Sequence, residues 1–367
     1  MNRVSRFSAG VVALFALAGV ARPARAHVDY VTEPGAAAVE AIEFLVEVLS
    51  SPLNLALVVG GTLGTVALLV AVLLVRPTVP DIEALRSVLD GYREYVPWML
   101  RLSLGLPLVG AGFAGYLFSP AVPAEARVLQ VALGFLLLCG LATRAVAATG
   151  LLVYLGTFVS NPELALAIEY VPGFLALVLV GSGRPSADHM LKQVADAPGT
   201  WYGRVDPVQG VADRFRAAVD PYERLVPTVL RVGLGVGFIY LGVTQKLADP
   251  GPALTVVDTY DLTAVVPVDP GLWVVGAGLT EAGVGLLLVA GYLTRAAAGT
   301  AFLMLVLTLF GLPDDPVLAH VTLFGMLSAV FTLGAGPLSV DAWLAARSDS
   351  ESGAEPGERE GTASLTD

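Results

Sequence analysis

The stretch YREYVPWMLRLSLG at residues 92–105 recurs as YERLVPTVLRVGLG at residues 222–235. The offset between matching positions is a constant 130 residues. The identical residues of the first copy are Tyr92, Val96, Pro97, Leu100, Arg101, Leu104 and Gly105, and those of the second are Tyr222, Val226, Pro227, Leu230, Arg231, Leu234 and Gly235. Self-similarity at a fixed offset is typical of an internal repeat.

Two further matches follow in the same order along the chain. The stretch GFLLLCGLATRA at residues 134–145 matches GLLLVAGYLTRA at residues 285–296. Later, Gly-Ser-Gly at residues 181–183, with Ser186 and Asp188 after it, matches Gly-Ala-Gly at residues 334–336, with Ser339 and Asp341 after it. Each copy holds an even number of apolar segments, so both have the same orientation in a membrane. The sequence predicts a parallel duplication of a four-helix bundle.

Composition places the protein in a membrane. Hydrophobic residues make up 55% of the 367 residues and charged residues only 14%, whereas soluble domains carry about 25% charged residues. A spanning helix needs roughly 20 apolar residues. We therefore predict an all-α integral membrane protein with about nine transmembrane helices: Leu53–Val75, Pro97–Phe118, Ala124–Leu141, Ala145–Ser160, Leu164–Val180, Val226–Lys246, Gly271–Ala290, Thr294–Leu312 and Val317–Leu333.

The N-terminus has the features of a secretory signal. Arg3 and Arg6 precede an apolar run and an Ala-Arg-Ala site at residues 24–26. This pattern predicts a signal peptide at residues 1–26, cleaved after Ala26, with an uncleaved anchor as the alternative. Residues 27–52 would then be extracytoplasmic.

The distribution of basic residues also predicts that the mature N-terminus faces outward. Of the 17 basic residues that remain after cleavage, only Arg127 and Lys246 fall on the outer side. The positive-inside rule therefore predicts a multi-pass plasma-membrane protein with its mature N-terminus outside and its C-terminus in the cytoplasm.

The repeat divides the rest of the chain. We expect an N-terminal transmembrane helix at residues 53–75, a first unit at 92–191, a cytoplasmic linker at 192–221 and a second unit at 222–344. The acidic tail at 348–367 is predicted to be disordered. The outer loop at residues 247–270 of the second unit is long and is either a lid or a simple connector.

Charge and residue counts exclude several classes of function. A net charge of −11 argues against a nucleic-acid partner. Cys139 is the only cysteine, so we expect neither a disulfide nor an iron–sulfur cluster. Only His320 of the three histidines lies in an apolar segment, so neither haem nor another metal is expected.

The second unit resembles the DoxX/DoxD family of four-helix membrane proteins. The resemblance covers about Tyr222–Leu344, with a weaker version at about Tyr92–Leu191. It rests on an ordered series of residues: Arg231, Gly235, Gly242, Lys246, Leu247, Glu281, Gly285, Leu288, Gly291 to Arg295, His320, Gly325 and Gly334 to Asp341. The first unit departs from this pattern, because Gln130 stands at the Glu281 position, no lysine matches Lys246 and Ile168 lies where His320 would be.

The resemblance implies membrane quinone chemistry, for example as a subunit of thiosulfate:quinone oxidoreductase. A quinone is therefore the expected cofactor, and electrons would come from a partner redox protein. The alternatives are a non-catalytic scaffold or assembly factor and a small-solute transporter. The lipid bilayer, a redox partner or further copies of the chain are the expected partners.

Glu281 is the sharpest candidate residue. A carboxylate near the bilayer centre costs about 2.5–3.5 kcal/mol on insertion scales, so it needs a proton or a partner. It is either a proton acceptor beside a quinone or half of a structural ion pair, most plausibly with Lys246. Lys246 could instead extend its ammonium to the membrane surface.

The other candidates also have two interpretations. Arg231 could bind a quinone carbonyl, but with Arg101, Arg144 and Arg295 it more simply caps helix C-termini. His320 could bind a quinone, relay a proton or hydrogen-bond within the bundle. The candidate catalytic residues are thus Glu281 and His320, and the candidate quinone-binding residues are Lys246, Arg231 and Glu281.

Overall fold

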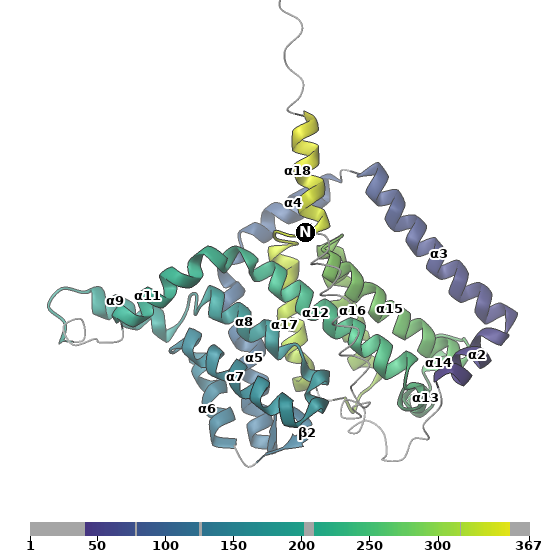
Figure 1. Cartoon of the computed structure of the whole chain (residues 1–367), viewed down its shortest axis with the longest axis horizontal. Helices are drawn as coiled ribbons and strands as arrows, with labels where there is room; N and C mark the ends of the chain where they lie inside the picture. Colours follow the sequence, from purple (N-terminus) through teal and green to yellow (C-terminus); the bar gives the residue numbers. More distant parts are fainter. Residues whose placement is uncertain (1–40, 78, 125–126, 202–208, 316, 353–367) are drawn as a thin grey trace, which may run out of the picture.

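The computed structural model describes residues 41–77, 79–124, 127–201, 209–315 and 317–352 (Figure 1). The predicted signal peptide and residues 353–367 of the acidic tail lie outside these ranges. Within the described part, six helices are long and apolar enough to span a bilayer, and three shorter apolar helices occupy the other predicted positions. The all-α membrane class is therefore confirmed. The local departure is a small antiparallel hairpin of β1 (Tyr116–Leu117) and β2 (Ser119–Pro123).

The N-terminal helices lie beside the bundle. Helix α2 (Ala41–Ser50), inside the predicted extracytoplasmic segment, packs through Phe44 and Val48 against the second unit. Helix α3 (Pro52–Val75) begins at Ser51, whose hydroxyl accepts from the Asn54 amide, and none of its apolar stretch is buried. It lies at one side of the molecule (Figure 1), where the Tyr292 hydroxyl donates to the Leu69 carbonyl at 2.7 Å, and lipid must cover the rest of its apolar surface. Helix α4 (Pro80–Asp90) leads to the first unit.

The first unit holds four helices. Its elements are η1 (Arg93–Tyr95), α5 (Val96–Ala114), α6 (Arg127–Cys139), α7 (Thr143–Ser160), η2 (Pro162–Ala167) and α8 (Tyr170–Val180). The span predicted at 164–180 is divided into the 3₁₀ turn η2 and helix α8. Proline explains the division, because Pro162 begins η2 and Pro172 lies in the first turn of α8, where a missing amide is tolerated.

The second unit repeats this order. It contains α12 (Val226–Gly242), the π-helical turn η4 (Val243–Leu247), α15 (Pro270–Ala290), α16 (Thr294–Gly311) and α17 (Val317–Leu333). The predicted outer loop at 247–270 forms two short helices, α13 (Pro250–Thr259) and α14 (Leu262–Val265). Val257 of α13 is buried against α15 and α2, so this segment packs onto the bundle.

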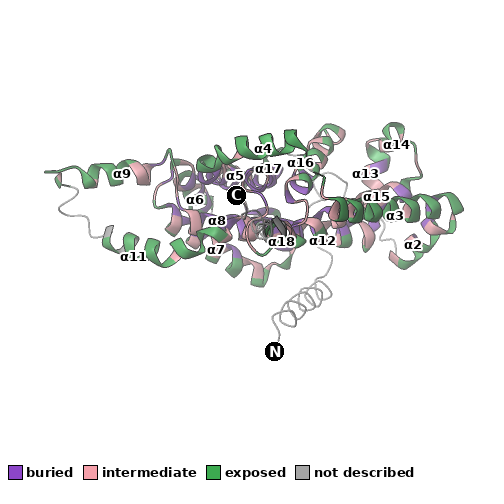
Figure 2. Cartoon of the chain, turned by 90° about the horizontal axis from the view of Figure 1, so that it is seen from above, coloured by how far each residue is buried: buried purple, intermediate pink, exposed green. Residues whose placement is uncertain are grey.

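Exposed helices connect the units and close the chain. Helix α9 (Ala187–Asp196) and α11 (Gln209–Val219), followed by η3 (Asp220–Leu225), lie largely in the predicted linker. They project at the end of the molecule opposite α2 and α3 (Figure 2). The last helix, α18, runs over Val340–Ser352, so the first residues of the predicted disordered tail are helical.

The two units meet through equivalent helices. Helix α5 packs against α17, and α12, the counterpart of α5, packs against α8, the counterpart of α17. Small residues allow the close approach: a side chain at Gly325 would meet Ser103, and one at Gly233 would meet Pro172. Ser103 and Gly233 are 130 residues apart, and Pro172 and Gly325 are 153 apart. The same pair of surfaces thus occurs twice, which is the pattern of a two-fold related interface.

Candidate functional site

One end of the bundle is held by arginine side chains, and we call it the arginine end. Arg231 is 1% exposed and donates to four backbone carbonyls, those of Leu288, Val289, Ala335 and Leu338, at 2.6–2.9 Å. Arg101 is 2% exposed and donates to the matching carbonyls of Leu138, Ser182 and Pro185 at 2.7–3.3 Å. Each guanidinium caps the C-terminus of the second helix of its unit, as predicted.

The turn between the second and third helices is also built alike in both units. Arg144 donates to the Leu179 carbonyl, and Arg295 to those of Phe331 and Thr332, so both cap a C-terminus. The Asp188 carboxylate accepts from the amides of residues 142 and 143, and that of Asp341 from residues 293 and 294. Ser186 and Ser339 cap the next helices, because the hydroxyl of each accepts from a backbone amide three residues later.

Lys246, Glu281 and His320 lie toward the other end, which we call the hairpin end because it carries β1 and β2. Glycine brings α12 and α15 together there. A side chain at Gly242 would meet the Gly278 carbonyl at 2.6 Å, and one at Gly235 would meet the Gly285 carbonyl at 2.6 Å. Lys246 lies one turn after Gly242, on η4, and Glu281 nearly one turn after Gly278. The close crossing therefore places the two charged side chains side by side.

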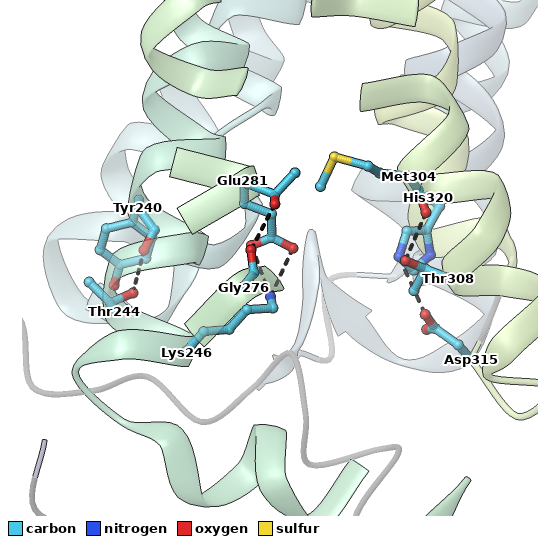
Figure 3. A network of polar contacts seen from close by, with 10 residues as sticks. Tyr240, Thr244, Lys246, Gly276, Glu281, Met304, Thr308, Asp315 and His320 are labelled. Atoms are coloured by element: carbon cyan, nitrogen blue, oxygen red, sulfur yellow. Dashed lines mark hydrogen bonds and ion pairs between the residues drawn. The ribbon is translucent and has the colours of Figure 1, made fainter. Parts of the chain in front are cut away.

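Lys246 and Glu281 form an ion pair (Figure 3). The Lys246 ammonium lies 2.9 Å from each carboxylate oxygen of Glu281. The side chains are 23% and 18% exposed, so the pair is partly buried but not sealed. Pairing with Lys246 was the structural alternative for Glu281, and the ammonium does turn inward instead of extending away from the bundle.

His320 belongs to a second, more deeply buried pair. Its Nε2 lies 3.4 Å from an Asp315 carboxylate oxygen, and both side chains are only 5% exposed. Figure 3 shows this pair separated from the Lys246–Glu281 pair, with the Met304 side chain between them. His320 therefore does not contact Glu281.

Arg231 is separate from both pairs. Its carbonyl partner Leu288 lies about two helical turns, or roughly 10 Å, beyond Glu281 on α15. Of the four candidates, the fold thus brings together Lys246 and Glu281, keeps His320 apart and places Arg231 near the arginine end.

A fifth ionisable residue, Glu169, was missed by sequence reasoning. It lies in the turn between η2 and α8 and lines two cavities where the units meet. The signal that could have identified it is a single acid in an apolar segment, the criterion applied to Glu281.

Comparison with known proteins finds one family match, and it lies within the second unit. The family model described as DoxX matches residues 226–314, which run from α12 through α16 and include Arg231, Lys246 and Glu281. His320 lies beyond the matched residues. No curated protein and no solved structure matches the chain.

Proposed function

We propose that this membrane protein, whose residues 226–314 match the DoxX family model, is a quinone-interacting subunit of a membrane redox complex, with its site at the Lys246–Glu281 pair. The observation that carries the proposal is the partial exposure of this pair within the matched domain. Complete burial of an ion pair costs desolvation energy, which the attraction between the charges repays only where further hydrogen bonds satisfy both groups. The pair instead keeps both head groups within reach of a molecule outside the bundle.

The chemistry follows from the two groups. A quinone, once bound, accepts two electrons and two protons, and the electrons come from the partner protein. Lys246 can donate a hydrogen bond to a carbonyl oxygen, and Glu281 can hold a proton at its carboxylate. The 2.9 Å contact holds both side chains in position, and breaking it would free both groups at once.

We extend the proposal to the whole chain. The arginine end faces the cytoplasm of a plasma-membrane protein, and the first unit is a degenerate duplicate of the second. The matched contacts of Arg101 and Arg231, and those of Asp188 and Asp341, favour common descent. The lack of a charged pair at Gln130 favours one quinone site per chain.

A non-catalytic scaffold or assembly factor is the second candidate. It is favoured by Arg231, all of whose hydrogen bonds go to backbone carbonyls, and by the sealed His320–Asp315 pair. In that case the Lys246–Glu281 pair fixes the crossing of α12 and α15. A transporter remains a third alternative, distinguished by a dependence on membrane potential or a solute gradient.

The test is the quinone content of the purified protein. Quinone is extracted from detergent-purified protein and quantified per chain by mass spectrometry for wild type and Glu281→Gln. We expect nearly one quinone per chain in wild type and a loss of about tenfold in the variant, equivalent to about 1.4 kcal/mol of binding free energy.

A matched control separates site effects from general ones. Glu47→Gln removes an exposed carboxylate from α2, which packs against α15, the helix that carries Glu281, and should leave the quinone content unchanged. Equal trace amounts in wild type and Glu281→Gln would contradict the quinone proposal. If Glu281→Gln also fails to assemble with partner proteins, the scaffold candidate is favoured.

A further inference from the structure

Three arginine side chains gather around one carboxylate at the arginine end. Asp90, the last residue of α4, lies 3.0 Å from the Arg93 guanidinium and 3.8 Å from that of Arg295. Arg86 lies one turn earlier on α4, and its charge and that of Arg93 both act on Arg295. We call these four residues the α4 cluster. Three guanidinium charges and one carboxylate charge leave an excess of two positive charges.

Neighbouring acids do not neutralise this excess through contacts. Glu83 on α4 and Glu94 of η1 form no ion pair with any basic side chain of the described residues. The charge of Asp341 also acts on Arg295, but its carboxylate already accepts from the amides of residues 293 and 294. Arg86 is exposed and has no ion-pair partner in the described part of the chain. The α4 cluster can therefore accept an anion from outside the chain.

The α4 cluster lies at the level of the membrane surface. Helix α3 has 24 residues, or about 36 Å at 1.5 Å per residue, which is enough to cross a hydrocarbon core of about 30 Å. Helix α4 begins five residues after α3 ends, and Figure 1 shows it turning away from α3 over the end of the bundle. Tyr92 and Tyr95, on either side of Arg93, are exposed, as is common for aromatic residues at a membrane surface. The guanidinium groups therefore lie where lipid headgroups lie.

An apolar face adjoins these charges on the same helix. Ile82, Leu85 and Val88 follow one another at intervals of three residues on α4, and all three are exposed. Side chains at this spacing are neighbours on a helix surface. A helix with charged residues on one side and exposed aliphatic residues on the other lies in the plane of a membrane surface. The acyl chains of a lipid can therefore cover this face while its headgroup contacts the arginines.

A matched cluster in the other copy of the repeat has a different charge, and we call it the α11 cluster. Arg216 and Asp220 take the places of the α4 residues at an offset of 130, and Arg144 takes the place of the α16 arginine at an offset of 151. Arg144 lies 3.6 Å from Asp220, so the ion pair is repeated. Glu223, however, stands where the first cluster has its η1 arginine, and its charge acts on Arg144. The next residue, Arg224, forms no ion pair among the described residues. The α11 cluster is therefore balanced, with two charges of each sign.

We propose that the α4 cluster binds the headgroup of an anionic phospholipid, with the phosphate at Arg86 and Arg93 and the acyl chains against the exposed face of α4. Guanidinium groups suit this ligand because their N–H groups form charge-assisted hydrogen bonds with phosphate oxygens. The site lies at the opposite end of the bundle from the Lys246–Glu281 pair, so it does not depend on the quinone proposal.

The test compares two phospholipids that have the same acyl chains. Phosphatidylglycerol, which carries a net negative charge, and phosphatidylcholine, which is neutral overall, are each titrated into the full-length protein in detergent and counted by native mass spectrometry. We expect a saturable site that binds phosphatidylglycerol about tenfold more tightly than phosphatidylcholine. Soluble glycerol phosphate should not compete, because it lacks the acyl chains that α4 contacts.

Two double variants that remove the same charge locate the site. Arg86→Gln combined with Arg93→Gln should weaken phosphatidylglycerol binding about tenfold. Arg214→Gln combined with Arg216→Gln removes two exposed arginines from α11 and should bind the lipid like wild type.

Any of three results would overturn the proposal. The first is equal affinity of wild type for the two phospholipids. The second is equal weakening by both double variants, which would indicate a general attraction to basic residues. The third is competition by glycerol phosphate, which would indicate a site for a free phosphate. The comparison of the two lipids needs only the wild-type protein, so it decides the matter even if a variant fails to fold.

Discussion

Gln130 and Glu281 occupy matched positions in the two units, 151 residues apart, yet their surroundings differ. Gln130 is 1% exposed, and neither polar atom of its side chain has a hydrogen-bond partner. Glu281 is 18% exposed and is paired with Lys246. The position matching Lys246 in the first unit is Tyr116, where the chain leaves α5 for the hairpin. The first unit has thus closed over the place that the second unit keeps accessible.

The hydrophobic cores of the two units also differ at the hairpin end. The first unit buries Phe118, Tyr154, Tyr170 and Phe174 together. At the positions matching the last three, the second unit has Leu305, Leu323 and Leu327. At the arginine end, by contrast, the two units keep the same contacts. The contacts at the arginine end therefore maintain the four-helix fold in both units, whereas the two units have diverged at the hairpin end.

The largest expected effect is the loss of a capping arginine. Arg231→Gln removes a buried guanidinium from four carbonyls and should destabilise the protein by at least about 3 kcal/mol, because each unsatisfied buried acceptor costs about 1–3 kcal/mol. Arg101→Gln should have a similar but smaller effect. The measurement is the free energy of unfolding in detergent micelles.

An exposed arginine serves as the control for that series. Arg214→Gln on α11 should change stability by less than about 0.5 kcal/mol. A large loss of stability in Arg231→Gln with no loss in Arg101→Gln would show that the two capping arginines do not stabilise their units equally.

An intermediate effect is expected at the ion pair. Lys246→Met leaves the Glu281 carboxylate without its partner and should cost about 1–2 kcal/mol, less than for a fully buried pair because both side chains retain some exposure. A double-mutant cycle of Lys246→Met with Glu281→Leu measures the coupling. Additive losses would mean that the 2.9 Å contact does not stabilise the fold.

The smallest effect tests the sealed position of the first unit. Gln130→Leu removes two unpartnered polar atoms from a buried site and should stabilise the protein by up to about 1 kcal/mol. Thermal unfolding of the variant beside wild type measures it. A clear destabilisation would indicate that Gln130 has a partner that the chain alone does not provide.

The sequence predicted the fold class because apolar composition and the repeat leave few alternatives. It also identified Arg231 and Arg101 as caps and Lys246 as the most plausible partner of Glu281. Helix ends leave carbonyls without partners and an unpaired charge in a membrane is costly, so these groups need partners whatever the packing. It missed Glu169, because the two cavities arise from the packing of units whose mutual contact leaves no periodic signal.

The amino-acid sequence by itself determined that this is a helical membrane protein with two units that share glycines and capping residues at matching positions. Apolar composition and glycine spacing are properties that can be read along the chain. Only the tertiary structure decided which polar groups meet. It paired Lys246 with Glu281 through the Gly242–Gly278 crossing, held His320 on Asp315, and left Glu169 between the units. Those outcomes depend on how helices distant in the chain approach one another.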